Sequence, residues 1–574
     1  MNKKKDPIPD SNPFEELMAD YYSASLALDP VNATFQGINE FNGLFPNYIS
    51  KEYLAKKKKT ISELKLRLNE INKENLSKQE RISYDILEWE LEIALDAFKF
   101  PFELTPIDQM WSINLVMGQL GSGGSAQPFE TKEDYDQWFN RLDGYMDWCE
   151  TALVNMRAGI RQGVVLPKSL IEKVIPQFKT LSQGPVEDHL FYKPALNIPT
   201  SISSEDKLEI KKEMVLLIHN KLIPQYKKIS NFLETEYFIA GRASSGVDAY
   251  SFGEELYNYM IRLNTTTNLS AREIHDIGLK EVKRLRTEME KVMEELNYSG
   301  DLLSFFDHVR NSKDLMPFSD PQEVIENFNK IHQRMLPQLD KLFDLKPKAA
   351  FEIKRTEAFR EESASAEYNP GSLDGTRPGI FYVPIPDVKK YNVYVDEDLF
   401  LHEAIPGHHY QISLQQENQD LPAFRKNLWY SSYGEGWALY CESLGKELGL
   451  YQDPYQYFGM LGNEMHRAIR LVVDTGIHAF GWSREKAIKY SLENEAESEA
   501  SITSEIERYM AMPGQALSYK IGQLKILELR KYAEETLGDD FSVKEFHNIM
   551  LQPGCVPLDI LDKITKEWID SKLN

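Results

Sequence analysis

Cysteine is scarce in this sequence, and basic residues are outnumbered. The 574 residues include 3 cysteines, which are widely spaced and form no C-x-x-C pair. This pattern argues against a disulfide-stapled extracellular scaffold and against zinc held by cysteine. The chain has 66 Lys and Arg residues and 89 Asp and Glu residues, which gives a formal net charge of −23. Such an acidic chain repels phosphates, so we expect no nucleic-acid partner.

Long apolar runs are also missing. No window approaches the ~18 continuous apolar residues that a membrane-spanning helix requires. The N-terminal stretch "MNKKKDPIPDSNPFEEL" has basic residues with no apolar segment after them, so the sequence as given predicts no signal peptide. We therefore expect a cytoplasmic protein. The alternative is a periplasmic or lipid-anchored protein whose leader has been removed.

The remaining composition predicts a large, mainly α-helical protein. Hydrophobic residues make up 42% of the chain, which is ample for a packed core. Residues 14–345 carry repeated helical patterns, with capping boxes at Ser77 and Ser270. We expect an N-terminal helical region, 1–345, that forms one wall of a cleft. A catalytic region, 346–574, would follow it within one continuous structural unit.

A small β-sheet is expected at the start of the second region. The segments 349–356, 379–386 and 391–398 are short, rich in β-branched or aromatic residues, and separated by Gly, Pro and Asn. An edge strand beside a catalytic helix can hold an extended peptide through backbone hydrogen bonds. Arg377 lies beside the segment expected to form this edge strand, 379–386, and could bind a peptide carboxylate through two hydrogen bonds.

Directly after the predicted sheet, "LFLHEAIPGHHYQ" places three histidines within eight residues. His402 and Glu403 begin like the zinc-peptidase motif H-E-x-x-H, but Pro406 stands where the second histidine belongs. Proline disrupts the helix, and the following glycine tolerates unusual backbone angles, so the Pro-Gly pair could bring His408 to the metal. His409 is the alternative, but on a straight helix it lies about 10 Å along the axis from His402. We therefore favour His408.

A hydrolytic zinc site needs a third protein ligand and a carboxylate that accepts a proton from water. Glu403 suits the second role. Glu435 is the candidate third ligand, because Gly434, Gly436 and Trp437 around it are unusual for a solvated helix face. Glu442 lies two turns further on and could orient a histidine.

Two later segments contain candidate substrate-binding residues. Arg470, Asp474 and His478 recur at four-residue spacing on an apolar helix, a pattern that a structural salt-bridged stripe would also produce. The segment "ERYMAMPGQALSYKIGQ" gathers hydrogen-bond donors around a second Pro-Gly pair: Arg508, Tyr509, Gln515 and Tyr519. A tyrosine hydroxyl can donate to an oxyanion while remaining neutral.

Four motifs in this order, "HEAIPGHHYQ", "GEGWALYCE", "RLVVDTGIHAFGW" and "RYMAMPGQALSYKIG", resemble the bacterial domain-of-unknown-function family eight-eight-five. Members of that family are often described as lipoproteins and are grouped with the zincin metallopeptidases. The resemblance covers nearly the whole chain and implies a mainly helical zincin fold. It also implies His402, His408 and Glu435 as metal ligands and Glu403 as the base.

The segment around Arg508 and Tyr509 also resembles, more weakly, the part of the angiotensin-converting-enzyme family that supplies an oxyanion tyrosine. That resemblance ranks Tyr509 above Tyr519 as the catalytic hydroxyl.

These observations predict a metallopeptidase with one Zn²⁺ per chain that hydrolyses short peptides, from the C-terminus if an arginine binds the terminal carboxylate. Two His and one Glu could also bind cobalt or manganese. Two other functions remain open: a non-catalytic helical binding protein with a structural or vestigial metal site, and a zinc hydrolase of non-peptide amides. Loss of activity on changing Glu403, and assays with peptides against small amides, would distinguish them.

Overall fold

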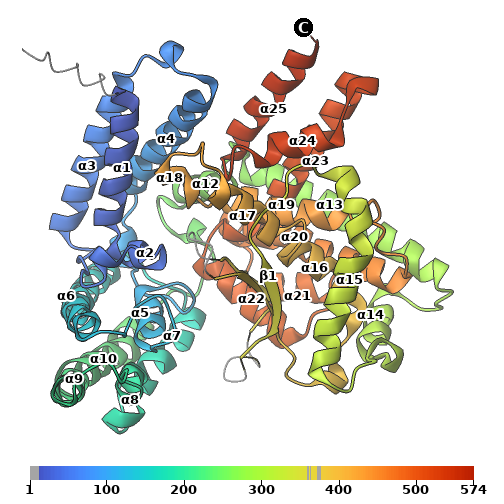
Figure 1. Ribbon diagram of the computed structural model, residues 1–574. Coiled ribbons are helices and arrows are strands. Elements are labelled where there is room, and N and C mark those ends of the chain that lie inside the picture. Colours follow the sequence, from blue (N-terminus) through green and yellow to red (C-terminus); the bar gives the residue numbers. More distant parts are fainter. Residues whose placement is uncertain (1–11, 358–360, 362–363, 372–376, 574) are drawn as a thin grey trace, which may run out of the picture. The chain divides into compact units, whose positions relative to one another are not determined.

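The computed structural model describes residues 12–573 apart from 358–360, 362–363 and 372–376, and it is mainly helical (Figure 1). The chain forms two compact units, Met1–Ser245 and Gly246–Asn574. The division expected from the sequence, at 345/346, falls inside the second unit, between a helix and the first strand. Within the described ranges, no helix combines the length and the apolar composition needed to cross a membrane.

The first unit is built from helices joined by short 3₁₀ and π-helical segments. Its α-helices are α1 (Pro13–Leu28), α2 (Pro30–Phe35), α3 (Lys51–Asn69), α4 (Lys78–Asp96), α5 (Ile113–Gly121), α6 (Lys132–Gln162), α7 (Lys168–Thr180), α8 (Lys193–Leu196), α9 (Ser204–Leu217), α10 (Ile223–Phe232) and α11 (Phe238–Ala240).

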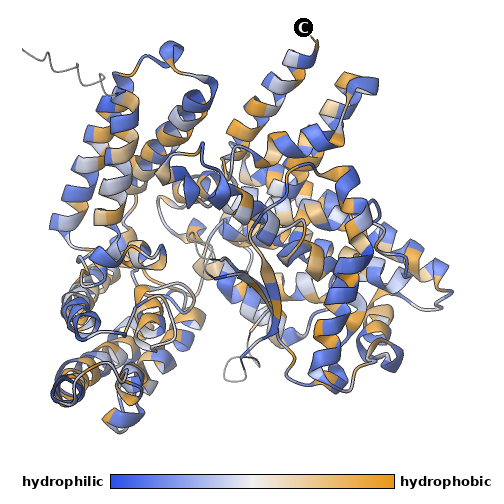
Figure 2. Cartoon of the chain, in the orientation of Figure 1, coloured by the Kyte–Doolittle hydropathy of each residue, from blue (hydrophilic) through white to orange (hydrophobic). Residues whose placement is uncertain are grey.

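Helix α6 runs through the core of this unit. Its buried residues, among them Trp138, Leu142 and Tyr145, recur every three or four positions, which places them on one side of the helix. They pack with Phe191 and Tyr226 into one hydrophobic cluster. Figure 2 shows the same principle more widely, since most helices carry hydrophobic residues interspersed with hydrophilic ones.

The second unit contains the sheet and most of the polar motifs. Its α-helices are α12 (Gly253–Thr265), α13 (Ala271–Glu295), α14 (Leu302–Asn311), α15 (Pro321–Leu342), α16 (Asp396–Glu403), α17 (His408–Glu417), α18 (Ala423–Lys426), α19 (Ser431–Ser443), α20 (Pro454–Ala479), α21 (Arg484–Leu492), α22 (Glu499–Ala511), α23 (Ser518–Leu537), α24 (Val543–Leu551) and α25 (Leu558–Leu573).

The helix starts expected from the sequence are confirmed. Ser77 and Ser270 each form a capping box, α4 beginning after the first and α13 after the second. Each serine side chain accepts a hydrogen bond from a backbone N–H three residues on, and a glutamate there bonds back to the serine backbone. These caps are local in sequence, so they could be predicted without knowledge of the fold.

The small sheet is also confirmed, with one strand placed differently. Strands β1 (Phe351–Arg355), β2 (Glu367–Asn369) and β3 (Gly379–Val383) lie in the order β1-β3-β2. β1 pairs with β3 in parallel and β2 pairs with β3 antiparallel. The strand expected over 391–398 is wrong: the side chain of Asn392 accepts a hydrogen bond from Tyr394 N, and the chain turns into α16.

The sheet order changes which strands can bind a peptide. β3, which Arg377 precedes, is the central strand, and its backbone already pairs on both sides. The expectation that this strand is an edge is therefore wrong, and β1 and β2 are the edges among the described strands.

Helices α19 and α23 pack backbone to backbone. A Cβ added at Gly522 would lie 1.8 Å from the carbonyl oxygen of Ser432 and 2.7 Å from Cα of Gly436. A Cβ at Gly436 would in turn lie 2.5 Å from Cα of Gly522. Glycine is therefore required at both positions, because any side chain would force the two helices apart.

Candidate metal centre

The Pro-Gly pair ends one helix and starts another. α16 ends at Glu403 and α17 begins at His408, with a cis peptide bond between Ile405 and Pro406. A Cβ on Gly407 would lie 1.9 Å from the carbonyl oxygen of His402, so only glycine allows the chain to fold back so closely. The indole N–H of Trp437, on α19, donates to the carbonyl oxygen of Pro406 at 2.8 Å and holds the turn.

This turn brings His402 and His408 together. Their ring centroids lie 4.7 Å apart, with the ring planes nearly perpendicular at 89°. Oε2 of Glu435, on α19, lies 3.5 Å from Nε2 of His402 and 3.4 Å from Nε2 of His408. The three ligand atoms all lie within 4.8 Å of one another. The structure thus brings together the three residues expected to bind the metal.

The donor set and its spacing fit zinc. Tetrahedral zinc with bonds of ~2.0–2.2 Å to N and O holds its ligand atoms about 3.4 Å apart. The two measured N–O distances, 3.5 and 3.4 Å, match that separation. Two imidazoles and one carboxylate also leave a fourth position for water or substrate, as a catalytic site requires.

Glu442 orients His402. Its Oε1 lies 2.6 Å from Nδ1 of His402, so a proton on Nδ1 leaves Nε2 free to bind a metal. The hydroxyl of Tyr451 donates to the backbone oxygen of Glu442 at 3.0 Å and to Oδ1 of Asp398 at 3.1 Å. This geometry agrees with the sequence-based suggestion that Glu442 orients a histidine.

The electrostatics of the cluster favour a cation. Burial lowers the pKa of His402, but hydrogen bonds to Glu435 and Glu442 outweigh it and raise the pKa to about 10. Burial raises the pKa of Glu435, but the charge of His408 and the hydrogen bond to His402 hold it well below its usual range. Carboxylates that stabilise imidazolium charge this strongly would also stabilise a metal ion that displaces those protons.

Glu403 lies beside the cluster. Its Oε1 is 4.0 Å from Nε2 of His402, too far for a hydrogen bond, and its side chain is buried. Burial raises the pKa of this carboxyl above its ordinary value. A carboxylate with a raised pKa, close to a metal position but not in the ligand cluster, suits proton transfer.

His409 faces away from the cluster. Its Nδ1 lies 2.9 Å from the hydroxyl of Tyr368 in β2, and its ring lies 4.7 Å from that of Phe351 in β1. Burial lowers the pKa of His409 to about 4, so it packs as a neutral side chain against the sheet. Arg377 also lies near this sheet. Burial raises the pKa of Tyr368, and the charge of Arg377 partly opposes that increase.

Asp474 and His478 tie α20 to neighbouring segments. Asp474 accepts hydrogen bonds from the hydroxyl of Tyr257 at 2.5 Å and from Gly514 N at 3.0 Å. His478 accepts from Val247 N at 3.2 Å, and its Nε2 bonds the carbonyl oxygen of Tyr509 at 2.9 Å. These buried contacts support the structural interpretation of the stripe that contains them.

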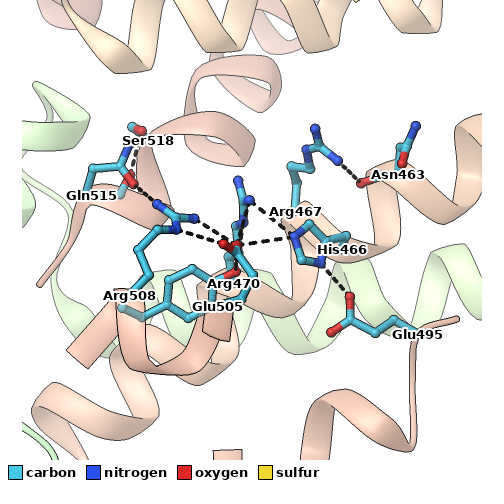
Figure 3. Close-up of polar contacts among 10 residues, drawn as sticks. Asn463, His466, Arg467, Arg470, Glu495, Glu505, Arg508, Gln515 and Ser518 are labelled. Atoms are coloured by element: carbon cyan, nitrogen blue, oxygen red, sulfur yellow. Dashed lines mark hydrogen bonds and ion pairs between the residues drawn. The ribbon is translucent and has the colours of Figure 1, made fainter. Parts of the chain in front are cut away.

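Arg470 belongs instead to a polar cluster around Glu505 (Figure 3). Arg470 and Arg508 both donate to Glu505, at 2.9–3.0 Å. The hydroxyl of Tyr509 donates to Glu505 at 2.7 Å and accepts from Nε of Arg470 at 3.0 Å. Arg508 also donates to Gln515 at 2.6 Å. The polar atoms of these predicted substrate-binding residues are therefore largely engaged with one another.

Tyr519 has a different environment. The guanidinium of Arg470 lies 4.6 Å from the centre of its ring, and within the described part of the chain its hydroxyl has no hydrogen-bond partner. Tyr519 sits one turn before Gly522, at the close contact with the helix that carries Glu435. Burial raises the pKa of Tyr519, and the charge of Glu435 raises it further.

Comparison with known proteins places the chain in a family. Residues 30–564 match the family described as "Bacterial protein of unknown function (DUF885)". The chain belongs to this family. No curated protein matches the sequence.

Two solved structures resemble this DUF885 protein along almost its full length. A candidate lipoprotein from Colwellia psychrerythraea is 26% identical, with a TM-score of 0.87, and the match covers 98% of this chain and 100% of that one. A candidate lipoprotein of unknown function from Shewanella oneidensis is 18% identical, with a TM-score of 0.76, and the match covers 96% of this chain and 99% of that one. The second likeness concerns the fold alone.

Several residues near the DUF885 site had no clear sequence signal. Arg467, His466 and Asn463 lie on α20 just before Arg470 (Figure 3), but their spacing resembles that of any polar helix face. Asp398 lies one turn before His402 and could have been noticed as an acidic residue on the same side of α16. Their importance depends on contacts between helices, which sequence spacing does not reveal.

Proposed function

We propose that this DUF885 protein is a zinc-dependent metallopeptidase that hydrolyses short peptides. The observation that carries the proposal is the convergence of His402, His408 and Glu435, with Glu403 beside them and outside the ligand set. Zinc would supply Lewis acidity, which makes water more acidic and polarises the scissile carbonyl. The strong net negative charge of the chain favours peptides over nucleic acid as substrates.

The proton transfers fall to Glu403. Its carboxylate accepts a proton from the attacking water as the new C–O bond forms. It then donates that proton to the leaving amine as the C–N bond breaks, so the reaction consumes one water and Glu403 is regenerated. Burial raises the pKa of this carboxyl, which makes it a stronger base for the first step than an ordinary carboxylate.

The proposal is tested by incubating the zinc-loaded chain with a library of short peptides and with small amides. We expect new peptide termini, detected by mass spectrometry, which disappear when a chelator removes the metal and return when zinc is added. Cleavage of small amides alone would favour the non-peptide hydrolase. Absence of all hydrolysis from zinc-loaded, folded protein would favour the binding protein.

Replacing Tyr519 by phenylalanine is expected to lower kcat by about 10²–10³-fold with little change in KM, because one hydroxyl donor to the developing oxyanion is lost. Tyr509 was the stronger candidate from sequence, but its hydroxyl is bonded to Glu505 and Arg470. Tyr509→Phe, measured in parallel, is expected to reduce kcat less. Equal activity of Tyr519→Phe and the unchanged protein would remove Tyr519 from the mechanism.

A further inference from the structure

Arg467 lies beside the helix that carries the candidate base. α16 and α20 pack together, and the Asn463 side chain on α20 donates to Oδ2 of Asp398 on α16 at 2.6 Å. Asp398 is one turn before His402, and Asn463 is one turn before Arg467, so each pair shares one side of its helix. This contact directs Arg467 toward α16.

The hydrogen bonding of Arg467 is incomplete. Its Nη1 makes only a long bond, 3.4 Å, to the carbonyl oxygen of Asn463, and its Nε is buried with no partner among the described residues. No carboxylate of the described chain lies within 4.0 Å of it, in contrast to Arg470 and Arg508, which share Glu505. Figure 3 shows the Arg467 guanidinium bonded to Asn463 and turned away from Glu505.

The charge of Arg467 acts on the reactive groups. Burial raises the pKa of Glu403, and Arg467 is among the positive charges that pull it back. Burial also raises the pKa of Asp398, to about 8, and the pKa of Tyr519. The charge of Arg467 opposes both increases. The charge of Arg467 therefore acts on the candidate base and on the candidate oxyanion donor. A partly buried guanidinium that has no carboxylate of the described residues within 4.0 Å favours binding of an anion at this point.

We propose that Arg467 binds the C-terminal carboxylate of the peptide substrate, so that the enzyme removes residues from the C-terminus. The proposal rests on the peptidase function above and adds the substrate class. A guanidinium binds a carboxylate through two parallel hydrogen bonds, which fixes the end of the peptide in position and orientation. Each extended residue spans ~3.3–3.6 Å, so the distance between the bound carboxylate and Glu403 sets how many C-terminal residues are removed.

The first test compares two libraries of short peptides that differ only in having a free or an amidated C-terminus. We expect the zinc-loaded chain to cleave the free-acid peptides preferentially. Arg467→Gln is expected to lower kcat/KM for the free acids by about tenfold or more and to change that for the amides little, which removes the preference. Arg286→Gln serves as the matched control, because it removes an arginine of α13 that donates to the backbone oxygen of Glu493 and to the side chain of Asn494.

The second test does not depend on turnover. A Glu403→Gln chain is mixed with both libraries, and the bound peptides are identified by mass spectrometry. We expect the Glu403→Gln chain to enrich free acids. The double variant that also carries Arg467→Gln should lose that enrichment. Amidated peptides with an internal Asp or Glu report whether a side-chain carboxylate can substitute.

The outcomes separate the two proposals. Selection of free acids that depends on Arg467, without any cleavage by the unchanged chain, would overturn the peptidase function and keep the carboxylate site. Equal treatment of acids and amides, or a preference that survives Arg467→Gln, would overturn the carboxylate site even if peptides are cleaved. Enrichment of internally acidic amides equal to that of free acids would likewise overturn it.

Discussion

Replacing Glu403 by glutamine is expected to reduce peptide hydrolysis by about 10²–10⁴-fold while leaving zinc bound, because the proton acceptor is lost and the ligands are not. Glutamine keeps nearly the same shape but cannot accept the proton of the attacking water. The measurement is kcat/KM on the best peptide from the library, alongside zinc content by mass spectrometry. Burial makes Glu403 unfavourable as a purely structural carboxylate, which supports a chemical role.

Glu528→Gln provides the matched control, since Glu528 is exposed on α23 and its one ion pair among the described residues is with the partly exposed Lys525. It is expected to keep full activity. If Glu403→Gln hydrolysed peptides at the rate of this control, the assignment of Glu403 as the base would be wrong. The non-catalytic or differently catalysed alternatives would then gain support.

Replacing His408 by alanine is expected to reduce zinc from about one ion per chain to nearly none, because a catalytic site of three protein ligands would be left with two. His409→Ala is the matched control one residue away. His409 contacts the sheet and not the ligand cluster, so this variant should retain zinc. The measurement is metal content after dialysis against a fixed low zinc concentration.

The two variants should differ in stability as well. His409→Ala removes a buried ring and its bond to Tyr368, which costs about 1–3 kcal/mol in the free energy of unfolding. His408→Ala should lose the zinc-dependent part of stability, so that a chelator lowers its melting temperature less than that of the unchanged chain. Zinc retained by His408→Ala and lost by His409→Ala would reverse the ligand assignment.

Features that depend on neighbouring residues could be predicted from the sequence. The capping boxes at Ser77 and Ser270 fall in this class, and so does the sheet before the His-Glu motif. The grouping of His402 with Glu435 could also be predicted, because the glycines and Trp437 around Glu435 are unusual on a solvated helix. In each case the signal lies within a few residues of the feature.

Features that depend on tertiary contacts could not be predicted. Residues 391–398 have the composition of a strand, but the Asn392 cap and the burial of Asp396 against Asn327 favour a turn into α16. The ranking of Tyr509 above Tyr519 as the catalytic hydroxyl stays a prediction. Only the bonds around Glu505 show that the Tyr509 hydroxyl is occupied. Arg467 was missed because its incomplete bonding is visible only when its neighbours are placed.

The direct backbone contact between Gly436 and Gly522 has a consequence for how this site can change. One helix carries Glu435 and the other carries Tyr519, so main-chain atoms set the spacing of the two helices that hold a metal ligand and a candidate catalytic hydroxyl. Elsewhere in the core, neighbouring side chains can repack around a substitution. At the contact between Gly436 and Gly522 there are no side chains that could do so. Changes of substrate preference should therefore arise on α20 and at the sheet edges, while the spacing between α19 and α23 stays constant.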